Sequence, residues 1–181
     1  PSCCCKESVP ILHSILDIGE LVECFETVRV SNSEKWSGVC CSVVKTLYVE
    51  GCCNEQSVRR LDFSQYSCLE TLLIGNKSFA CVKEVNLNGL PCLDSVIIFA
   101  GCCVDIEMNG IVREPNSRFY LKNCPRVKKL MIGPASFASY GVCDISDVPK
   151  LETIDIGDLE ENSLNFFHAD LHLSGMTSVS L

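Results

Sequence analysis

The residues best suited to chemistry in this chain are two histidines and an aspartate near the C-terminal end of the sequence. They occur in the segment His168-Ala169-Asp170-Leu171-His172. If this segment is a strand with Leu171 facing a core, both histidines and Asp170 share the outer face, because side chains alternate along a strand. Two imidazoles and a carboxylate on one face could hold a metal ion. The alternative is an exposed polar strand face, and a flat sheet face offers no pocket for catalysis.

Cysteines form the second chemically reactive group. The chain has 15 cysteines in 181 residues, a composition typical of a disulfide scaffold in an oxidising compartment. The count is odd, so complete pairing within the chain would leave one thiol free or bonded to another molecule. The alternative is that some cysteines are small buried apolar residues of a core. The disulfide candidates are one triplet and three doublets: Cys3, Cys4, Cys5, Cys40, Cys41, Cys52, Cys53, Cys102 and Cys103.

A third site is an acceptor sequence for N-glycosylation at Asn76-Lys77-Ser78. A sequon of this kind marks Asn76 as a glycosylation candidate on a turn that follows a strand. Ser78 also belongs to a repeated Ser-Phe element, so the sequon can equally arise from the repeat itself.

Charge and hydropathy exclude two classes of partner. The net charge is -8 at pH 7, whereas binding to nucleic acid requires a basic surface. The longest apolar runs, such as 96–100, are too short to cross a bilayer. Basic residues gather between Arg113 and Lys129, and acidic residues between Asp144 and Asp170. These two segments are either solvated faces or surfaces for complementary contact with another copy or a partner.

Two kinds of short strand alternate along most of the sequence, each with apolar residues at alternating positions. Strands of the first kind, such as 69–74 and 93–98, recur with a period of about 24 residues, which indicates a solenoid. Stacking each kind on itself predicts two parallel sheets and few helices. Glycines such as Gly75 and Gly133 are expected to permit a positive φ after the strand. The first kind is expected at 16–19, 44–49, 69–74, 93–98, 127–132 and 151–156, and the second at 25–30, 58–63, 82–87, 119–121, 140–145 and 169–173.

Segments 69–79 and 127–137, with Leu90-Pro91 and Cys124-Pro125 between units, resemble leucine-rich repeat proteins. The Ile-Gly-x-x-Ser-Phe element is similar to that of the BspA-like class of bacterial and protist surface proteins. The resemblance implies binding or assembly and brings no catalytic residues. The laddered asparagine of many leucine-rich repeats occurs only sporadically, as Asn123, and no cysteine-bounded cap is recognisable.

We therefore expect a mainly β leucine-rich-repeat solenoid at 25–181, with insertions near 31–43, 101–117 and 158–165. Residues 1–24 form an N-terminal segment that is a degenerate repeat or a cap. The expected function is non-enzymatic protein–protein contact at a cell surface or outside the cell, without cofactor, metal, nucleic acid or membrane span. The alternative is a structural subunit that assembles end to end into an extracellular filament or sheath, with disulfide links between copies. Uncapped ends would make the chain a homo-oligomer or polymer.

Overall fold

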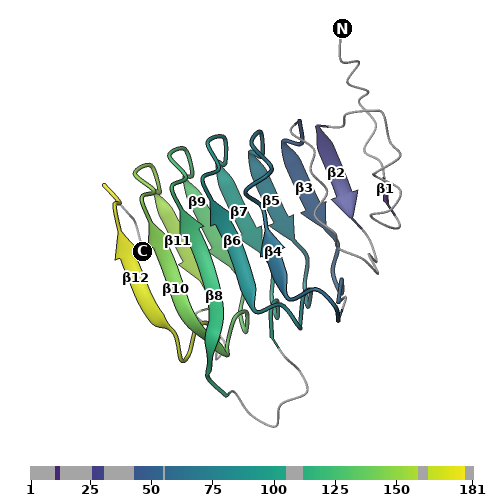
Figure 1. Ribbon diagram of the computed structural model, residues 1–181, viewed down its shortest axis with the longest axis vertical. Helices are drawn as coiled ribbons and strands as arrows, with labels where there is room; N and C mark the ends of the chain where they lie inside the picture. Colours follow the sequence, from purple (N-terminus) through teal and green to yellow (C-terminus); the bar gives the residue numbers. More distant parts are fainter. Residues whose placement is uncertain are drawn as a thin grey trace, which may run out of the picture.

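The structure is a computed structural model that describes residues 11–12, 26–30, 43–54, 56–104, 112–158 and 163–177. Within these ranges the chain is mainly β, without helices, and its strands form two parallel sheets (Figure 1). In the same ranges, no helix is long and apolar enough to cross a membrane.

The larger sheet has seven strands, and each pairs in parallel with its neighbours. In spatial order they are β1 (Ile11–Leu12), β2 (Thr27–Val30), β3 (Thr46–Val49), β5 (Thr71–Ile74), β7 (Ser95–Ile98), β9 (Lys129–Ile132) and β11 (Thr153–Ile156). The smaller sheet has five strands: β4 (Arg60–Asp62), β6 (Glu84–Asn88), β8 (Glu114–Lys122), β10 (Tyr140–Ser146) and β12 (Asp170–Ser174). From β3 onward the chain alternates between the sheets. We call one strand of the larger sheet, the next strand of the smaller sheet and their connections a unit.

The prediction that segment 25–30 is a strand of the second kind is wrong. β2 lies in the larger sheet and pairs directly with β3, with Thr27 opposite Thr46. Val28 and Val30 are buried, and the same alternation of buried and outward residues suits either sheet. The pattern alone therefore could not assign the sheet. Segment 16–19 and, apart from Ile11 and Leu12, the whole of 1–24 lie outside the described residues.

The core lies between the sheets and contains the inward side chains of both. Phe79 and Phe137, the phenylalanines of the Ser-Phe elements, are 2% and 0% exposed, which confirms that they fill the interior. The Phe137 ring stacks on Phe166 with centroids 5.1 Å apart. The Tyr140 hydroxyl group donates a hydrogen bond of 2.8 Å to the Val82 carbonyl oxygen, as expected for a buried phenol.

Glycines that follow strands of the larger sheet are needed for close approach between units. Gly75 and Gly133 are absent from the positive-φ positions of the described chain, so the prediction of a positive φ there is wrong. A Cβ atom added to Gly133 would lie 2.7 Å from the Ala100 backbone nitrogen, and one on Gly75 would overlap the backbone of Gly51. The positive φ values fall later in the same turns, at Lys77, Phe79, Ala135 and Phe137 among others.

A ladder of buried hydrogen bonds connects successive units. The Ser78 hydroxyl group donates to the Glu50 carbonyl oxygen at 3.0 Å, and the Ser136 hydroxyl group donates to that of Phe99 at 3.0 Å. Between them, the Cys102 thiol donates to the Gly75 carbonyl oxygen at 3.1 Å. Each donor side chain thus satisfies a carbonyl group of the preceding unit.

The insertion expected at 101–117 is shorter in the structure. Cys102 and Cys103 follow the turn geometry of Ser78 and Phe79: the Cys103 amide donates to the Ser78 carbonyl oxygen, and Cys103 has a positive φ like that of Phe79. At the other end, Glu114 to Ser117 already belong to β8. Residues 105–111 lie outside the description, as do 31–42 and 159–162 in the other two insertions.

Candidate interaction surface

The outward side of the larger sheet carries a row of side chains in register, with apolar residues in the middle. Leu73 is paired with Tyr48 on one side and with Ile97 on the other. The pairing continues to both ends of the row, which we call the central row: Arg29, Tyr48, Leu73, Ile97, Met131 and Asp155. The inward neighbours Leu72 and Val96 are 0% exposed, so the central row faces away from the core.

Two further rows flank the central row on the same face. The first of these, which we call the hydroxyl row, has hydroxyl side chains at every position except Lys129. It comprises Thr27, Thr46, Thr71, Ser95, Lys129 and Thr153. The third row follows the ends of the strands and comprises Glu50, Gly75, Phe99, Gly133 and Gly157. Phe99 is 42% exposed and lies between two glycines, so its ring rises above neighbours that have no side chain.

Two hollows lie on this face, one on each side of the line between β5 and β7. The first has a volume of about 320 Å³ and is lined by Thr27, Arg29, Thr46, Tyr48 and Leu73. The second has a volume of about 190 Å³, and its lining includes Ile97, Phe99, Met131, Pro134 and Asp155. Both hollows are bordered by the apolar part of the central row, so the face is concave in two places as well as apolar.

The ends of the central row have opposite charges. The Arg29 guanidinium group lies 3.6 Å from the Glu50 carboxylate and 4.7 Å from the centroid of the Tyr48 ring. None of the ion pairs among the described residues involves Asp155. One end is therefore a cation held in place by neighbours, and the other is an exposed carboxylate.

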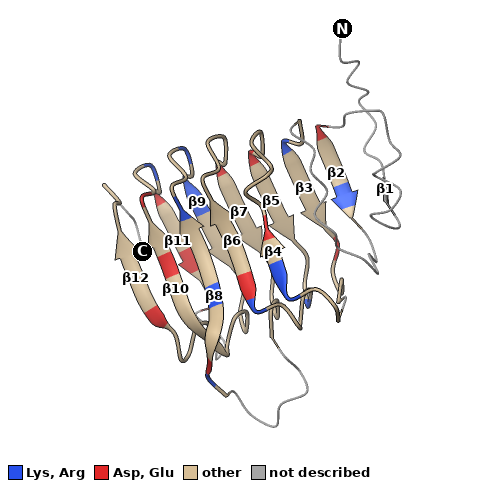
Figure 2. Cartoon of the chain, viewed as in Figure 1, with Lys and Arg blue, Asp and Glu red and all other residues tan. Residues whose placement is uncertain are grey.

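The outward side of the smaller sheet is charged, and its charges pair with one another (Figure 2). Arg60 forms ion pairs with Asp62 at 3.0 Å and with Glu84 at 3.2 Å. Lys122 binds Asp144 at 2.8 Å. Partial burial acts to raise the pKa of Asp144, but the hydrogen bond and the positive charge of Lys122 outweigh it, so this pKa lies below its ordinary value. We call this face the charged face.

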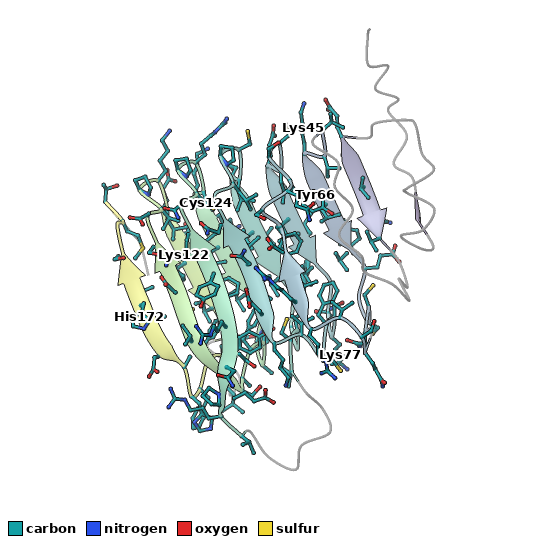
Figure 3. The ribbon with its side chains drawn as sticks, in the orientation of Figure 1. Lys45, Tyr66, Lys77, Lys122, Cys124 and His172 are labelled. Carbon is teal, nitrogen blue, oxygen red and sulfur yellow. The ribbon has the colours of Figure 1, made fainter. Side chains whose placement is uncertain are left out.

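The histidines singled out in the sequence lie at the end of the charged face. Asp170 and His172 are on β12 (His172 is labelled in Figure 3), but His168 lies in the turn before it, with its ring 4.8 Å from that of Phe167. Asp170 binds Arg113 at 2.7 Å. Within the described ranges, no group of three or more metal-ligating side chains is close enough to hold an ion. Leu171 is 57% exposed because no described strand lies beyond β12.

The structure places the disulfide candidates in different environments. Cys52 is an exposed thiol, whereas Cys53, Cys102 and Cys103 are buried. Burial raises the pKa of Cys102 to about 11 and that of Cys103 well above its ordinary value. Cys102 and Cys103 thus fit the alternative of small core residues. Cys3, Cys4, Cys5, Cys40 and Cys41 lie outside the described residues, and a disulfide for them stays a prediction.

The glycosylation sequon is part of the backbone architecture. Asn76 is exposed, and its side-chain oxygen accepts a hydrogen bond of 3.0 Å from the Ala100 amide. Ser78 is 0% exposed and belongs to the buried ladder. The repeat therefore explains both residues, and glycosylation of Asn76 stays a prediction.

The central row was not among the predicted sites, although the sequence carries a signal for it. Leu73, Ile97 and Met131 occupy the x position of Leu-x-x-Leu-x-Ile, where alternation leads one to expect a polar residue. Tyr48 is on this face, whereas Tyr66 is 2% exposed and belongs to the core.

A scan against protein-family models finds no match for this chain, and neither do searches of curated proteins and of solved structures.

Proposed function

We propose that this chain is a leucine-rich-repeat solenoid that binds a protein partner through the outer face of its larger sheet and has no catalytic activity. Support for the solenoid comes from the alternation of strands between two sheets. Two hydrogen bonds between neighbouring units also have the same spacing: the Asn86 side chain donates to Asp62, and the Ala100 amide donates to the Asn76 side chain, each across 24 residues. A regular spacing of this length is typical of stacked repeats.

The observation that carries the binding function is the apolar middle of the central row. A sheet face that meets only water is normally polar, and contiguous apolar patches on a surface mark interaction sites. Tyr48, Met131 and Phe99 are of the residue types that are enriched at protein interfaces. The outer face of the larger sheet thus has both the composition and the hollows of a binding surface.

Site-specific photo-cross-linking tests this proposal. We would place benzoylphenylalanine at Leu73 on the central row and, as a matched control, at Asn86 on the charged face, and irradiate the protein in the cells or medium that produce it. Both positions are outward and half-buried. We expect a discrete protein adduct from position 73 and none from position 86. Adducts from position 86 alone, or from neither position, would contradict the proposal.

The proposed location, at a cell surface or outside the cell, is supported by the resemblance and by the cysteine content. Differential alkylation followed by mass spectrometry of the native protein tests it. We expect disulfides among the cysteines of the N-terminal 41 residues, together with thiols at Cys102 and Cys103. A protein in which every cysteine is a thiol would contradict the oxidising location.

A second candidate function is end-to-end assembly, which a separate observation favours. Phe167, Leu171 and Leu173 in the last described unit are 62%, 57% and 44% exposed, and another copy could cover them. Electron microscopy of concentrated protein should then show filaments, and Leu171→Lys should abolish them. A monodisperse particle under several buffer conditions would exclude this candidate.

A further inference from the structure

We propose that the outer face of the larger sheet is a homodimer interface, in which the central row of one copy lies antiparallel on that of a second copy. This inference rests on the binding function proposed above and names its partner. Along the central row a cation, Arg29, comes first and a carboxylate, Asp155, comes last, with apolar side chains between them. A row in this order is complementary to its own reverse, as a two-fold symmetric interface requires.

The register between strands defines the contacts. A two-fold axis parallel to the strands, passing between β5 and β7, reverses the row and places Leu73 opposite Ile97 of the second copy. The same operation places Tyr48 opposite Met131, and Arg29 opposite Asp155. Symmetry makes each contact occur twice, so the interface would hold two ion pairs at its ends and four apolar contacts between them.

The third row and the hydroxyl row fit the same operation. Phe99, which is 42% exposed, meets Gly75 of the second copy, so a protruding ring lies opposite a residue without a side chain. Thr71 meets Ser95, which places hydroxyl groups against hydroxyl groups. The middle positions of all three rows are therefore complementary under one axis.

Under this axis, each hollow also lies opposite a large side chain of the second copy. The hollow of about 320 Å³ beside Tyr48 and Leu73 lies opposite Met131 of the second copy. The hollow of about 190 Å³ beside Ile97 and Met131 lies opposite Tyr48 of the second copy. Each copy thus offers a large side chain for each hollow of the other.

The other two-fold axis in the plane of the interface, perpendicular to the strands, gives a poorer fit. It would place Arg29 against Arg29 and Asp155 against Asp155. Like charges that face each other across an interface are strongly unfavourable. Both axes keep the strands of the two sheets aligned, as sheets that pack face to face do, so the charges decide between them.

The dimensions of the face predict a weak, reversible dimer. With strands about 4.8 Å apart, the central row from β2 to β11 is about 24 Å long, and a four-residue strand adds about 13 Å of width. These dimensions give about 300 Å² per copy, or about 600 Å² in total, which is below the roughly 1,200–2,000 Å² of stable specific interfaces and in the range of weak, transient contacts. Dissociation is therefore expected within the concentration range of a sedimentation experiment.

Sedimentation velocity of the purified chain, from about 1 µM to several hundred µM, tests the proposal. We expect a monomer–dimer equilibrium for the wild-type chain. Asp155→Lys should raise the Kd about tenfold or more, because it turns both terminal ion pairs into repulsive pairs. Arg29→Glu should also raise it, and the double variant Arg29→Glu with Asp155→Lys should recover much of the loss, because it restores opposite charges across the interface.

Two controls separate interface effects from folding effects. Glu152→Lys makes the same charge change one residue before β11, at an exposed position off the face, and should leave the Kd unchanged. Phe99→Ser removes the protruding ring without changing charge and should raise the Kd. Urea unfolding of each variant reports whether the fold is intact, which matters for Arg29→Glu because Arg29 also pairs with Glu50.

A wild-type chain that stays monomeric throughout would overturn the inference, as would a dimer whose Kd is insensitive to Asp155→Lys and Phe99→Ser. The cross-linker at position 73 distinguishes this failure from failure of the proposed function. An adduct with a different protein and none with a second copy overturns the homodimer alone, whereas no adduct of either kind overturns both proposals.

Discussion

The outer faces of the two sheets share one backbone geometry and one core, and they differ in what their outward side chains contact. On the charged face, Arg60 and Lys122 find carboxylates on the same or the neighbouring strand. On the larger sheet, Leu73 and Ile97 lie beside other side chains of the central row and remain partly exposed. One face thus satisfies its side chains within the chain, whereas the other leaves apolar area that a second molecule can cover.

The largest expected loss of stability should distinguish the core from the central row that lies above it. Leu72 and Leu73 are adjacent on β5, but Leu72 is 0% exposed and Leu73 points outward. Leu72→Ala should lower the free energy of unfolding by about 2–5 kcal/mol because it leaves a cavity. Leu73→Ala should cost less than about 1 kcal/mol. Urea unfolding at low protein concentration measures both, and equal losses would show that the central row is part of the core.

Thiol reactivity tests how completely the two sheets exclude solvent from the core between them. Burial raises the pKa of Cys102 to about 11 and that of Cys143 to about 12. At pH 8, the thiolate fraction of Cys102 should be about a hundredfold below that of an ordinary cysteine. Iodoacetamide should therefore label the exposed Cys52 in the folded protein and label Cys102 and Cys143 only after unfolding, as peptide mass spectrometry can show. Rapid labelling of Cys143 in the native protein would indicate an open core.

The dependence of stability on pH should arise from the charged face. The folded-state pKa of Asp144 is lowered from 3.8, so its contribution is complete above about pH 4 and is lost as the pH falls through the folded-state pKa. Lys122 has a raised pKa, so its contribution is present below its unfolded pKa and is lost as the pH rises through the folded value. Asp144→Asn should cost about 1 kcal/mol at pH 7, and this cost should shrink as the pH falls through the folded-state pKa. A constant difference between the two proteins from pH 7 to pH 2 would contradict this assignment.

The smallest effect concerns the exposed end of the charged face. The Arg60 side chain is 56% exposed in its pair with Glu84, and exposed pairs contribute about 0–1 kcal/mol. Arg60→Gln should change the free energy of unfolding by a few tenths of a kcal/mol at low salt and by less in 1 M NaCl, because salt screens exposed charges. A loss that persists at high salt would indicate packing by the arginine stem.

Much of the fold followed from local patterns in the sequence. Alternating apolar residues, with a period near the unit length, sufficed to predict two parallel sheets. The assignment of β2 failed because Val28 and Val30 fit either sheet. A positive φ was the wrong explanation for Gly75, which is needed for close approach between units. Close approach depends on how the units stack, and it leaves no local signal in the sequence.

The candidate interaction surface was harder to predict than the core. Leu73, Ile97 and Met131 are each apolar where the alternation predicts a polar residue. They can be recognised as one surface only when the register of their three strands is known. Ile97 and Met131 are separated by a longer connection than Leu73 and Ile97, and a period count alone does not align them. The expectation that His168 lies on the same strand as Asp170 and His172 was wrong, because β12 begins at Asp170 and leaves His168 in the preceding turn.

The buried ladder makes each unit depend on the unit that follows it in the sequence. The Cys53 amide donates to the Ser78 hydroxyl group at 3.3 Å, and the Cys102 amide to that of Ser136 at 3.1 Å, so each of these turns has backbone groups that only the following unit can satisfy. A chain that leaves the ribosome from its N-terminal end therefore always exposes one unsatisfied turn, which the next unit closes as it emerges. Synthesis and folding can thus advance together, one unit at a time.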